Sequence, residues 1–205
     1  MNEKIVGIGH SKTGTSTLAA CFREFGYRHT SQHLRLLEEV KRGYLQGSFD
    51  LADAYDSFED WPWPLIYRQL DARYPNSKFI LTVRKNTEVW LKSMKKHAER
   101  LGPTKNRSLV YGHPMPHGHE DAYASIYETH NREVLEYFKD RPSQLMVVCW
   151  ENGTGWKELC EFLKQDIPNV PFPHSNKGPI LSRSRLKRKL FFWLTGKWKT
   201  DPGMN

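Results

Sequence analysis

A run of small and hydroxyl-bearing residues around one lysine lies close to the start of the chain. Its members are, in order, Gly9, His10, Ser11, Lys12, Thr13, Gly14, Thr15, Ser16 and Thr17. Small residues let backbone N–H groups turn toward an anion, and a helix that starts there adds partial positive charge. Lys12 adds a full charge. The pattern predicts a phosphate-binding loop, and the alternative is an ordinary turn that caps a helix.

The position of the lysine separates this loop from the GxxxxGK[ST] loop of ATP- and GTP-binding proteins. In that loop the lysine follows the second glycine and adjoins a hydroxyl that binds Mg²⁺, whereas Lys12 precedes Gly14. The order SKTGTS resembles instead the P-K-[ST]-G-T-[ST] loop of the sulfotransferases that use 3′-phosphoadenosine-5′-phosphosulfate, although His10 and Ser11 replace the usual residues before the lysine. The resemblance implies that the donor is bound by Ser11, Lys12, Thr13, Gly14, Thr15, Ser16 and Thr17.

A second anion-binding residue is expected at Arg84, which ends the apolar run 78–83. In the sulfotransferases that the chain resembles, an arginine here and a serine about two helical turns later bind the 3′-phosphate of the donor. Ser93 is that serine, nine residues on where eight is usual. A guanidinium suits the role because it binds phosphate bidentately and keeps its charge; the alternative for Arg84 is a surface ion pair. Lys177, before Gly178, resembles a basic segment that contacts the same phosphate in animal cytosolic sulfotransferases.

The resemblance covers about residues 3–178 and is strongest toward compact bacterial-type sulfotransferases. The stretches 55–62 and 74–84 fit their D-x-P … YP-x-[SA]-K-x-ILTVR signature, and the stretches 155–163 and 170–177 are similar to their C-terminal part. It implies in-line transfer of a sulfuryl group to a hydroxyl or amine, with adenosine 3′,5′-bisphosphate as the spent donor. The sulfuryl group carries less charge than a phosphoryl group, so we expect a lysine to serve in place of a metal ion.

Two catalytic roles then need residues. Lys12 is expected to neutralise charge on the bridging oxygen as the sulfuryl group departs. The acceptor's proton needs a base within hydrogen-bond reach, which in the family is a His or a carboxylate upstream of the arginine-bearing strand. Asp60 is the first choice, with Asp56, Glu59 and His33 as rivals. The alternative for Asp60 is a cap at the start of a helix.

Apolar segments alternate with amphipathic segments along the chain. Strands are expected at 4–9, 78–83 and 145–150, with a further strand at 48–54; helices are expected at 14–25, 31–42, 64–74, 87–100, 120–139 and 155–164, and a long loop at 102–118. The alternation predicts a single-domain, P-loop-like α/β fold with a parallel sheet of about four or five strands and helices on both faces. Ligands bind such sheets at the carboxyl ends of the strands, which places the phosphate loop, Arg84 and Glu151 along one edge.

Composition favours one domain with a basic tail. The 205 residues suffice for a single core, and residues 177–199 hold eight Lys or Arg and no acidic residue, which accounts for the formal net charge of +8. We expect a sulfotransferase domain at 1–178 and a basic, helical tail at 179–205, whose residues 183–199 suit an acidic membrane surface better than nucleic acid. Three cysteines without CxxC spacing, together with no leader or membrane-spanning run, favour a reduced, cytoplasmic protein.

Several alternatives stay open at this stage. A non-catalytic module would keep the anion loop and use its tail to reach a membrane or nucleic acid, and a P-loop kinase would require ATP with Mg²⁺. Trp61 and Trp63 either wall the acceptor pocket or belong to the core. The histidine-rich stretch 113–121 invites a metal site, but its Pro and Gly content favours a lid, and no metal site is predicted.

Overall fold

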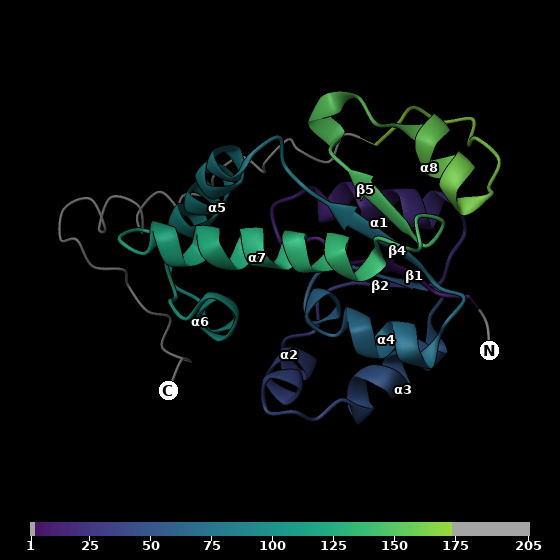
Figure 1. Ribbon diagram of the computed structural model, residues 1–205. Coiled ribbons are helices and arrows are strands. Elements are labelled where there is room, and N and C mark those ends of the chain that lie inside the picture. The colour runs from purple at the N-terminus through teal and green to yellow at the C-terminus, as the bar shows by residue number, and fades with distance from the viewer. Residues whose placement is uncertain (1–2, 174–205) are drawn as a thin grey trace.

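The computed structural model describes residues 3–173, and its centre is one parallel sheet. The strand order is β2-β3-β1-β4-β5 (Figure 1). The strands are β1 (Ile5–Gly7), β2 (His29–Thr30), β3 (Ser57–Phe58), β4 (Lys78–Thr82) and β5 (Leu145–Val148). The predicted α/β fold with a parallel sheet of four to five strands is confirmed.

Helices form every long connection between the strands, as parallel pairing requires. They are α1 (Thr15–Glu24), α2 (Leu34–Lys41), α3 (Gln46–Ala54), α4 (Tyr67–Arg73), α5 (Thr87–Leu101), α6 (Lys105–Tyr111), α7 (Glu120–Phe138) and α8 (Trp156–Leu163). Two 3₁₀ turns, Trp63–Leu65 and Trp150–Asn152, follow β3 and β5.

Helices cover both faces of the sheet, because strand side chains alternate between two apolar clusters. One cluster joins β1 and β4 to α3, α4 and α7 through Val6, Phe79, Ala52, Leu70 and Val134. The other joins them to α1 and α8 through Ile5, Ile80, Leu18, Phe22 and Leu159. Figure 1 shows α8 above the sheet, α3 and α4 below it, and α7 running across the front.

A third apolar cluster lies beyond the carboxyl ends of the strands, between α2, α5, α6 and α7. It contains Leu37, Trp61, Trp90, Met94, Val110, Tyr111, Tyr123 and Tyr127. Trp90 stacks on Tyr127 with ring centroids 4.2 Å apart, and Tyr111 stacks on Tyr123 at 4.3 Å. Trp61 and Trp63 are both buried in the core, and Trp61 also lines the cavity described below, whereas Trp63 does not. This cluster carries the elements that wall the site described below.

Two predicted elements are wrong. Residues 48–54, expected as a strand, belong to α3: Ser48 and Ala52 lie four residues apart on its buried face, and Gln46 donates to Asp50 one turn on at 2.6 Å. The loop expected at 102–118 contains α6, whose buried residues Arg107, Val110 and Tyr111 follow helical spacing. In both cases short helical periodicity was hidden by polar residues and nearby glycine or proline.

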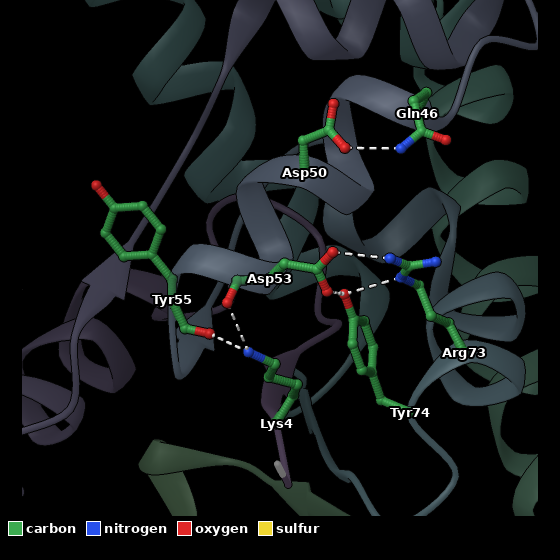
Figure 2. Close-up of polar contacts among 7 residues, drawn as sticks. All are labelled: Lys4, Gln46, Asp50, Asp53, Tyr55, Arg73 and Tyr74. Carbon is green, nitrogen blue, oxygen red and sulfur yellow. Dashed lines mark hydrogen bonds and ion pairs between the residues drawn. The ribbon is translucent and has the colours of Figure 1, made fainter. Parts of the chain in front are cut away.

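The amino end of the sheet is closed by a polar network (Figure 2). The Lys4 ammonium donates to the backbone oxygens of Asp53 and Tyr55, at 3.4 and 2.7 Å. The Asp53 carboxylate accepts hydrogen bonds from Tyr74, at 2.5 Å, and from Arg73, at 2.7 Å. These contacts join the start of β1 to the ends of α3 and α4.

Several predicted features lie outside the described residues. They are the basic tail at 179–205 with its helix and its membrane contact, Lys177, and the domain boundary at 178. Within residues 3–173, no helix combines the length and apolar character that a membrane crossing requires.

Candidate active site

The phosphate loop joins β1 to α1 and is held by side chains from neighbouring strand ends. At its start, a Cβ on Gly9 would lie 2.1 Å from the hydroxyl of Thr82 in β4, so only glycine fits there. The Trp90 indole donates to Ser11 O at 3.0 Å, and the Trp150 indole donates to Gly14 O at 3.2 Å. These bonds satisfy the two carbonyls and fix the course of the loop.

Two residues of the loop adopt left-handed backbone angles. Gly14 has φ of 99°, and a Cβ there would lie 2.3 Å from the Trp150 ring. Lys12 has φ of 74°, which costs a non-glycine residue free energy. Strain of this kind persists where the surrounding contacts impose it, as the two indoles do here.

The loop hydroxyls divide into two groups. Thr13 is fully buried, and its hydroxyl bonds His10 O and the Thr82 hydroxyl, each at 2.6 Å. Thr17 is also buried. Thr15 and Ser16 line the open side of the loop. Thr13 and Thr17 therefore contribute to the loop's shape, and only their backbone remains for a ligand.

A cavity of about 270 Å³ opens at the carboxyl edge of the sheet. Its walls include eight residues expected from the sequence: Ser11, Lys12, Gly14, Thr15, Ser16, Asp60, Arg84 and Ser93. The remaining lining residues are Gln32, Trp61, Met94, His97, Leu101, Thr104, Asn106 and Arg107. One cavity thus brings together residues from four separate parts of the chain.

Arg84 follows β4 and is held in place on three sides. Its guanidinium pairs with Glu151 at 2.7 Å and donates to Lys12 O at 3.3 Å, while its backbone N–H donates to the Tyr127 hydroxyl at 3.1 Å. The Lys85 backbone N–H and then Arg84 lower the pKa of Glu151, so this carboxylate stays ionised. Arg84 both forms an ion pair and lines the cavity. Arg84, Glu151 and the loop lie at one edge, as predicted.

Asp60 lies directly after β3 with φ of 64°. Its Oδ1 accepts hydrogen bonds from the Ser11 hydroxyl, at 2.7 Å, and from the Trp61 backbone N–H, at 2.8 Å. Burial, and next the negative charge of Glu59, raise the pKa of Asp60 to about 6 against the opposing effects of these hydrogen bonds and of Lys12. A carboxyl group of this kind takes up and releases a proton near neutral pH.

The three rivals of Asp60 lie away from the cavity. Asp56 precedes β3, at the amino end of the sheet, and pairs with Arg28 at 2.7 Å. Glu59 is buried under the loop, where its carboxylate accepts a short hydrogen bond from the Ser31 hydroxyl. The ring of His33 bonds the Thr30 hydroxyl at 2.6 Å. None of the three lines the cavity.

Lys12 lies in a strongly positive environment. Burial lowers the pKa of its ammonium, and the charges of Arg100 and Arg84 lower it further, while Asp60 opposes them. Within residues 3–173, no carboxylate forms an ion pair with Lys12. A lysine without a fixed partner, beside a loop of donors, is suited to a ligand that brings negative charge.

Sequence reasoning missed the far wall of the cavity. His97 and Leu101 follow Ser93 at intervals of four residues on α5, which is a helical signal that was available. Arg107 was hidden because its segment was expected to be a loop. In the histidine-rich stretch, the rings of His113 and His119 stack at 3.6 Å. Among the described residues, no three His, Cys, Asp or Glu side chains group as metal ligands would.

Comparison with known proteins identifies the family of the chain. The family model of the sulfotransferase domain matches residues 4–179, which is most of the chain. The chain is also 26% identical over 215 residues to the Ava biosynthesis cluster protein M of Aspergillus versicolor, an alignment that covers 83% of this chain and 80% of that protein. The family match contains the phosphate loop, Asp60, Arg84 and Ser93. The chain belongs to the sulfotransferase family and is an enzyme of that kind.

Proposed function

We propose that this sulfotransferase takes its sulfuryl group from 3′-phosphoadenosine-5′-phosphosulfate and transfers it in line to a hydroxyl or amine of an acceptor. The observation that carries the proposal is that Lys12, Asp60 and Arg84 line one cavity although they follow three different strands. A transfer of this type needs positioning and charge stabilisation more than covalent chemistry. The cavity offers both.

The donor's two anionic ends are assigned to two groups of residues. The phosphosulfate lies against the backbone N–H groups of residues 11–17 and the hydroxyls of Thr15 and Ser16, with Lys12 beside it. The 3′-phosphate lies against Arg84 and Ser93, with Lys177 as a further contact. Arg84 keeps one N–H on Nη1 and one on Nη2 for this purpose, because its bonds to Glu151 and to Lys12 O use only three of the five guanidinium N–H groups. That ion pair also fixes the direction of the guanidinium before the nucleotide arrives.

Lys12 and Asp60 divide the chemistry. The bond between sulfur and the bridging phosphate oxygen breaks while a bond forms between sulfur and the acceptor oxygen or nitrogen. Lys12 neutralises the charge that grows on the departing phosphate oxygen. Asp60 accepts the proton of the acceptor hydroxyl or amine. A base with a pKa of about 6 is ionised at neutral pH and still basic enough to take up that proton.

Three further parts of the proposal depend on charge and composition rather than on a contact within residues 3–173. Lys12 supplies the positive charge that a metal ion supplies in phosphoryl transfer, so the reaction needs no metal. The basic residues 183–199 suit an acidic membrane surface. The cytoplasmic location inferred from the cysteines also stays a prediction.

Nucleotide binding tests the donor assignment. Adenosine 3′,5′-bisphosphate in the presence of EDTA is expected to raise the melting temperature by about 5–10 °C at a hundredfold excess over its Kd. AMP, which lacks only the 3′-phosphate, serves as the matched control and should give a smaller shift. Stabilisation by ATP that requires Mg²⁺, with none from the bisphosphate, would favour a kinase instead.

A further inference from the structure

The cavity extends beyond the residues assigned to the donor. Ser93, His97 and Leu101 lie on one face of α5 and span about 12 Å along its axis, at a rise of about 1.5 Å per residue. The donor contacts end at Ser93. The wall beyond it is formed by His97 and Leu101 with Thr104 and Arg107 from the segment before and within α6. This far half is where the acceptor must lie.

Two arginines bring positive charge to this far half: Arg107 lines it, and Arg100 contacts His97 without being one of the lining residues. Arg107 is 2% exposed, and its guanidinium donates to the backbone oxygens of Pro114, at 2.8 Å, and Gly102. Arg100 donates to His97 Nδ1 at 2.9 Å. Within residues 3–173 neither arginine forms an ion pair with a carboxylate. Asp60 is the one acidic residue in the described lining. A buried cation without a counter-charge is costly unless a ligand supplies one.

The far half also holds more hydrogen-bond donors than acceptors. Arg100 Nε, Thr104 Oγ1 and Trp61 Nε1 are buried without a hydrogen-bond partner in the described part of the chain. An arginine only donates, so His97 Nδ1 is the acceptor in their bond. Burial lowers the pKa of His97 to about 3, helped by the charge of Lys12. The ring is therefore neutral and carries its proton on Nε2, which makes it a further donor.

We propose that the far half of the cavity binds an oxyanion of the acceptor, so that the substrate is an anionic hydroxy or amino compound, either a carboxylate or a phosphate ester. The inference rests on the proposed function and adds the class of acceptor to it. The oxyanion lies against Arg107, Thr104 and the Nε2 of His97, and Arg100, which is bonded to His97 Nδ1, adds positive charge next to this wall. Trp61, Met94 and Leu101 supply apolar surface for the body of the molecule between the anion and Asp60. The reacting hydroxyl or amine then lies near Asp60 and Lys12.

Anion binding to the nucleotide-loaded enzyme tests this subsite without a known acceptor. The protein is titrated by calorimetry in two states, nucleotide-free and saturated with adenosine 3′,5′-bisphosphate. In each state the titrants are inorganic phosphate, benzoate and benzamide. We expect one of the two anions to bind the saturated protein at least about tenfold more tightly than benzamide. A preference for phosphate indicates a phosphate ester, and a preference for benzoate indicates a carboxylate.

Variants identify the residues that hold the anion. Arg107→Gln is expected to weaken the anion about tenfold and to leave the affinity for the bisphosphate within about twofold. Thr104→Val provides a second, smaller loss that does not depend on Arg107. Lys92→Gln removes an exposed cation from another face of α5 and serves as the control for general charge. Equal losses in Arg107→Gln and Lys92→Gln would mean that only general charge is involved, which overturns the subsite.

The outcomes separate this inference from the donor assignment. A protein that binds the bisphosphate but neither anion, or that binds benzamide as tightly as both anions, overturns the anionic acceptor alone. A protein that binds an anion through Arg107 but not the bisphosphate contradicts the donor and leaves the anion subsite in place. Binding of neither contradicts both.

Discussion

Lys4 at the amino end of the sheet and Lys12 at the carboxyl end are both lysines whose pKa is lowered by burial, but their neighbours differ. Lys4 donates to two backbone oxygens, and the charges of Asp56 and Asp53 oppose the lowering of its pKa (Figure 2). Lys12 lies near Arg100 and Arg84, which lower its pKa further. The first lysine has partners within the fold, and the second is left for a ligand.

Asp53 at the amino end and Asp60 at the carboxyl end also differ in their surroundings, and their pKa values shift in opposite directions. Hydrogen bonds from Tyr74 and then Arg73 lower the pKa of Asp53, so folding favours its charge. Burial and the charge of Glu59 raise the pKa of Asp60 to about 6, so folding disfavours its charge. Lys12 and Asp60 also have positive φ angles, whereas neither Lys4 nor Asp53 does. The amino end stabilises the sheet, and the carboxyl end retains strain and unpaired charge that suit catalysis.

The largest expected effect comes from replacing Lys12. Lys12→Met should lower kcat by about a thousandfold, because the developing charge on the departing oxygen loses its nearest cation. The free energy of unfolding should stay the same or rise, since a buried cation without a counter-charge is removed. Single-turnover kinetics and urea unfolding measure the two quantities.

Lys4→Met is the matched control for that prediction. It leaves the carbonyls of Asp53 and Tyr55 without their donor and should reduce the free energy of unfolding by about 1–3 kcal/mol with kcat unchanged. A loss of kcat in Lys4→Met, or a loss of stability alone in Lys12→Met, would contradict the division between the two ends.

Asp60→Asn is expected to lower kcat/KM by about a hundredfold to a thousandfold, because the acceptor loses its base. In the unmodified enzyme, kcat/KM should rise with pH up to about 6 and then level off, as Asp60 ionises. Its folded-state pKa lies above the unfolded value, so the charged form reduces stability at neutral pH. The variant should therefore be more stable by roughly 1–3 kcal/mol at pH 7.5, and this gain should vanish near pH 4. A pH–rate profile without a limb near pH 6 would exclude Asp60 as the base.

Arg84→Gln is expected to weaken adenosine 3′,5′-bisphosphate about tenfold to a hundredfold and to leave the affinity for AMP nearly unchanged. The reason is that Arg84 is assigned to the 3′-phosphate, which AMP lacks. Arg73→Gln removes the corresponding ion pair at the amino end and should change neither affinity. Calorimetric titration of both nucleotides checks this. Equal weakening of the two nucleotides would place Arg84 at the 5′ end instead.

The central part of the fold was predictable because its strands lie within continuous apolar runs of the sequence. Residues 4–9 and 78–83 contain β1 and β4, which lie in the middle of the sheet and are buried on both faces. By contrast, β2 and β3 have two residues each, and their pairing depends on neighbours far away in sequence. No local pattern marks strands that short.

The same reasoning explains which site residues could be found. The phosphate loop and Arg84 follow predicted strands, and parallel strands bring their carboxyl ends together. His97 and Arg107 belong to α5 and α6, which reach the cavity only because the aromatic residues Trp90, Tyr111, Tyr123 and Tyr127 pack beyond the sheet. That packing comes from tertiary contacts, so the sequence signalled the far half only through the helical spacing of His97 and Leu101 after Ser93.

The smallest expected effect comes from replacing Asp53 at the amino end of the sheet. It concerns how the free energy of unfolding changes with pH. Asp53→Asn should destabilise the protein by less than about 1 kcal/mol at pH 7, because its ion pair with Arg73 is largely exposed. The folded-state pKa of Asp53 lies below its unfolded value. Its contribution is therefore present above about pH 4, the unfolded value, and is lost as the pH falls through the lower folded value. The difference between the unmodified protein and Asp53→Asn should vanish in acid.

The two aspartate variants together make the test decisive. At pH 7.5, Asp60→Asn should be more stable than the unmodified protein and Asp53→Asn less stable, as measured by urea unfolding in parallel across pH 3.5–8. Lowering the pH should remove the first difference between about pH 6 and 4, and the second only below about pH 4. Differences of the same sign would mean that both ends of the sheet stabilise the fold alike. The contrast between a stabilising end and a catalytic end would then fail, even if Lys12 and Arg84 behave as expected.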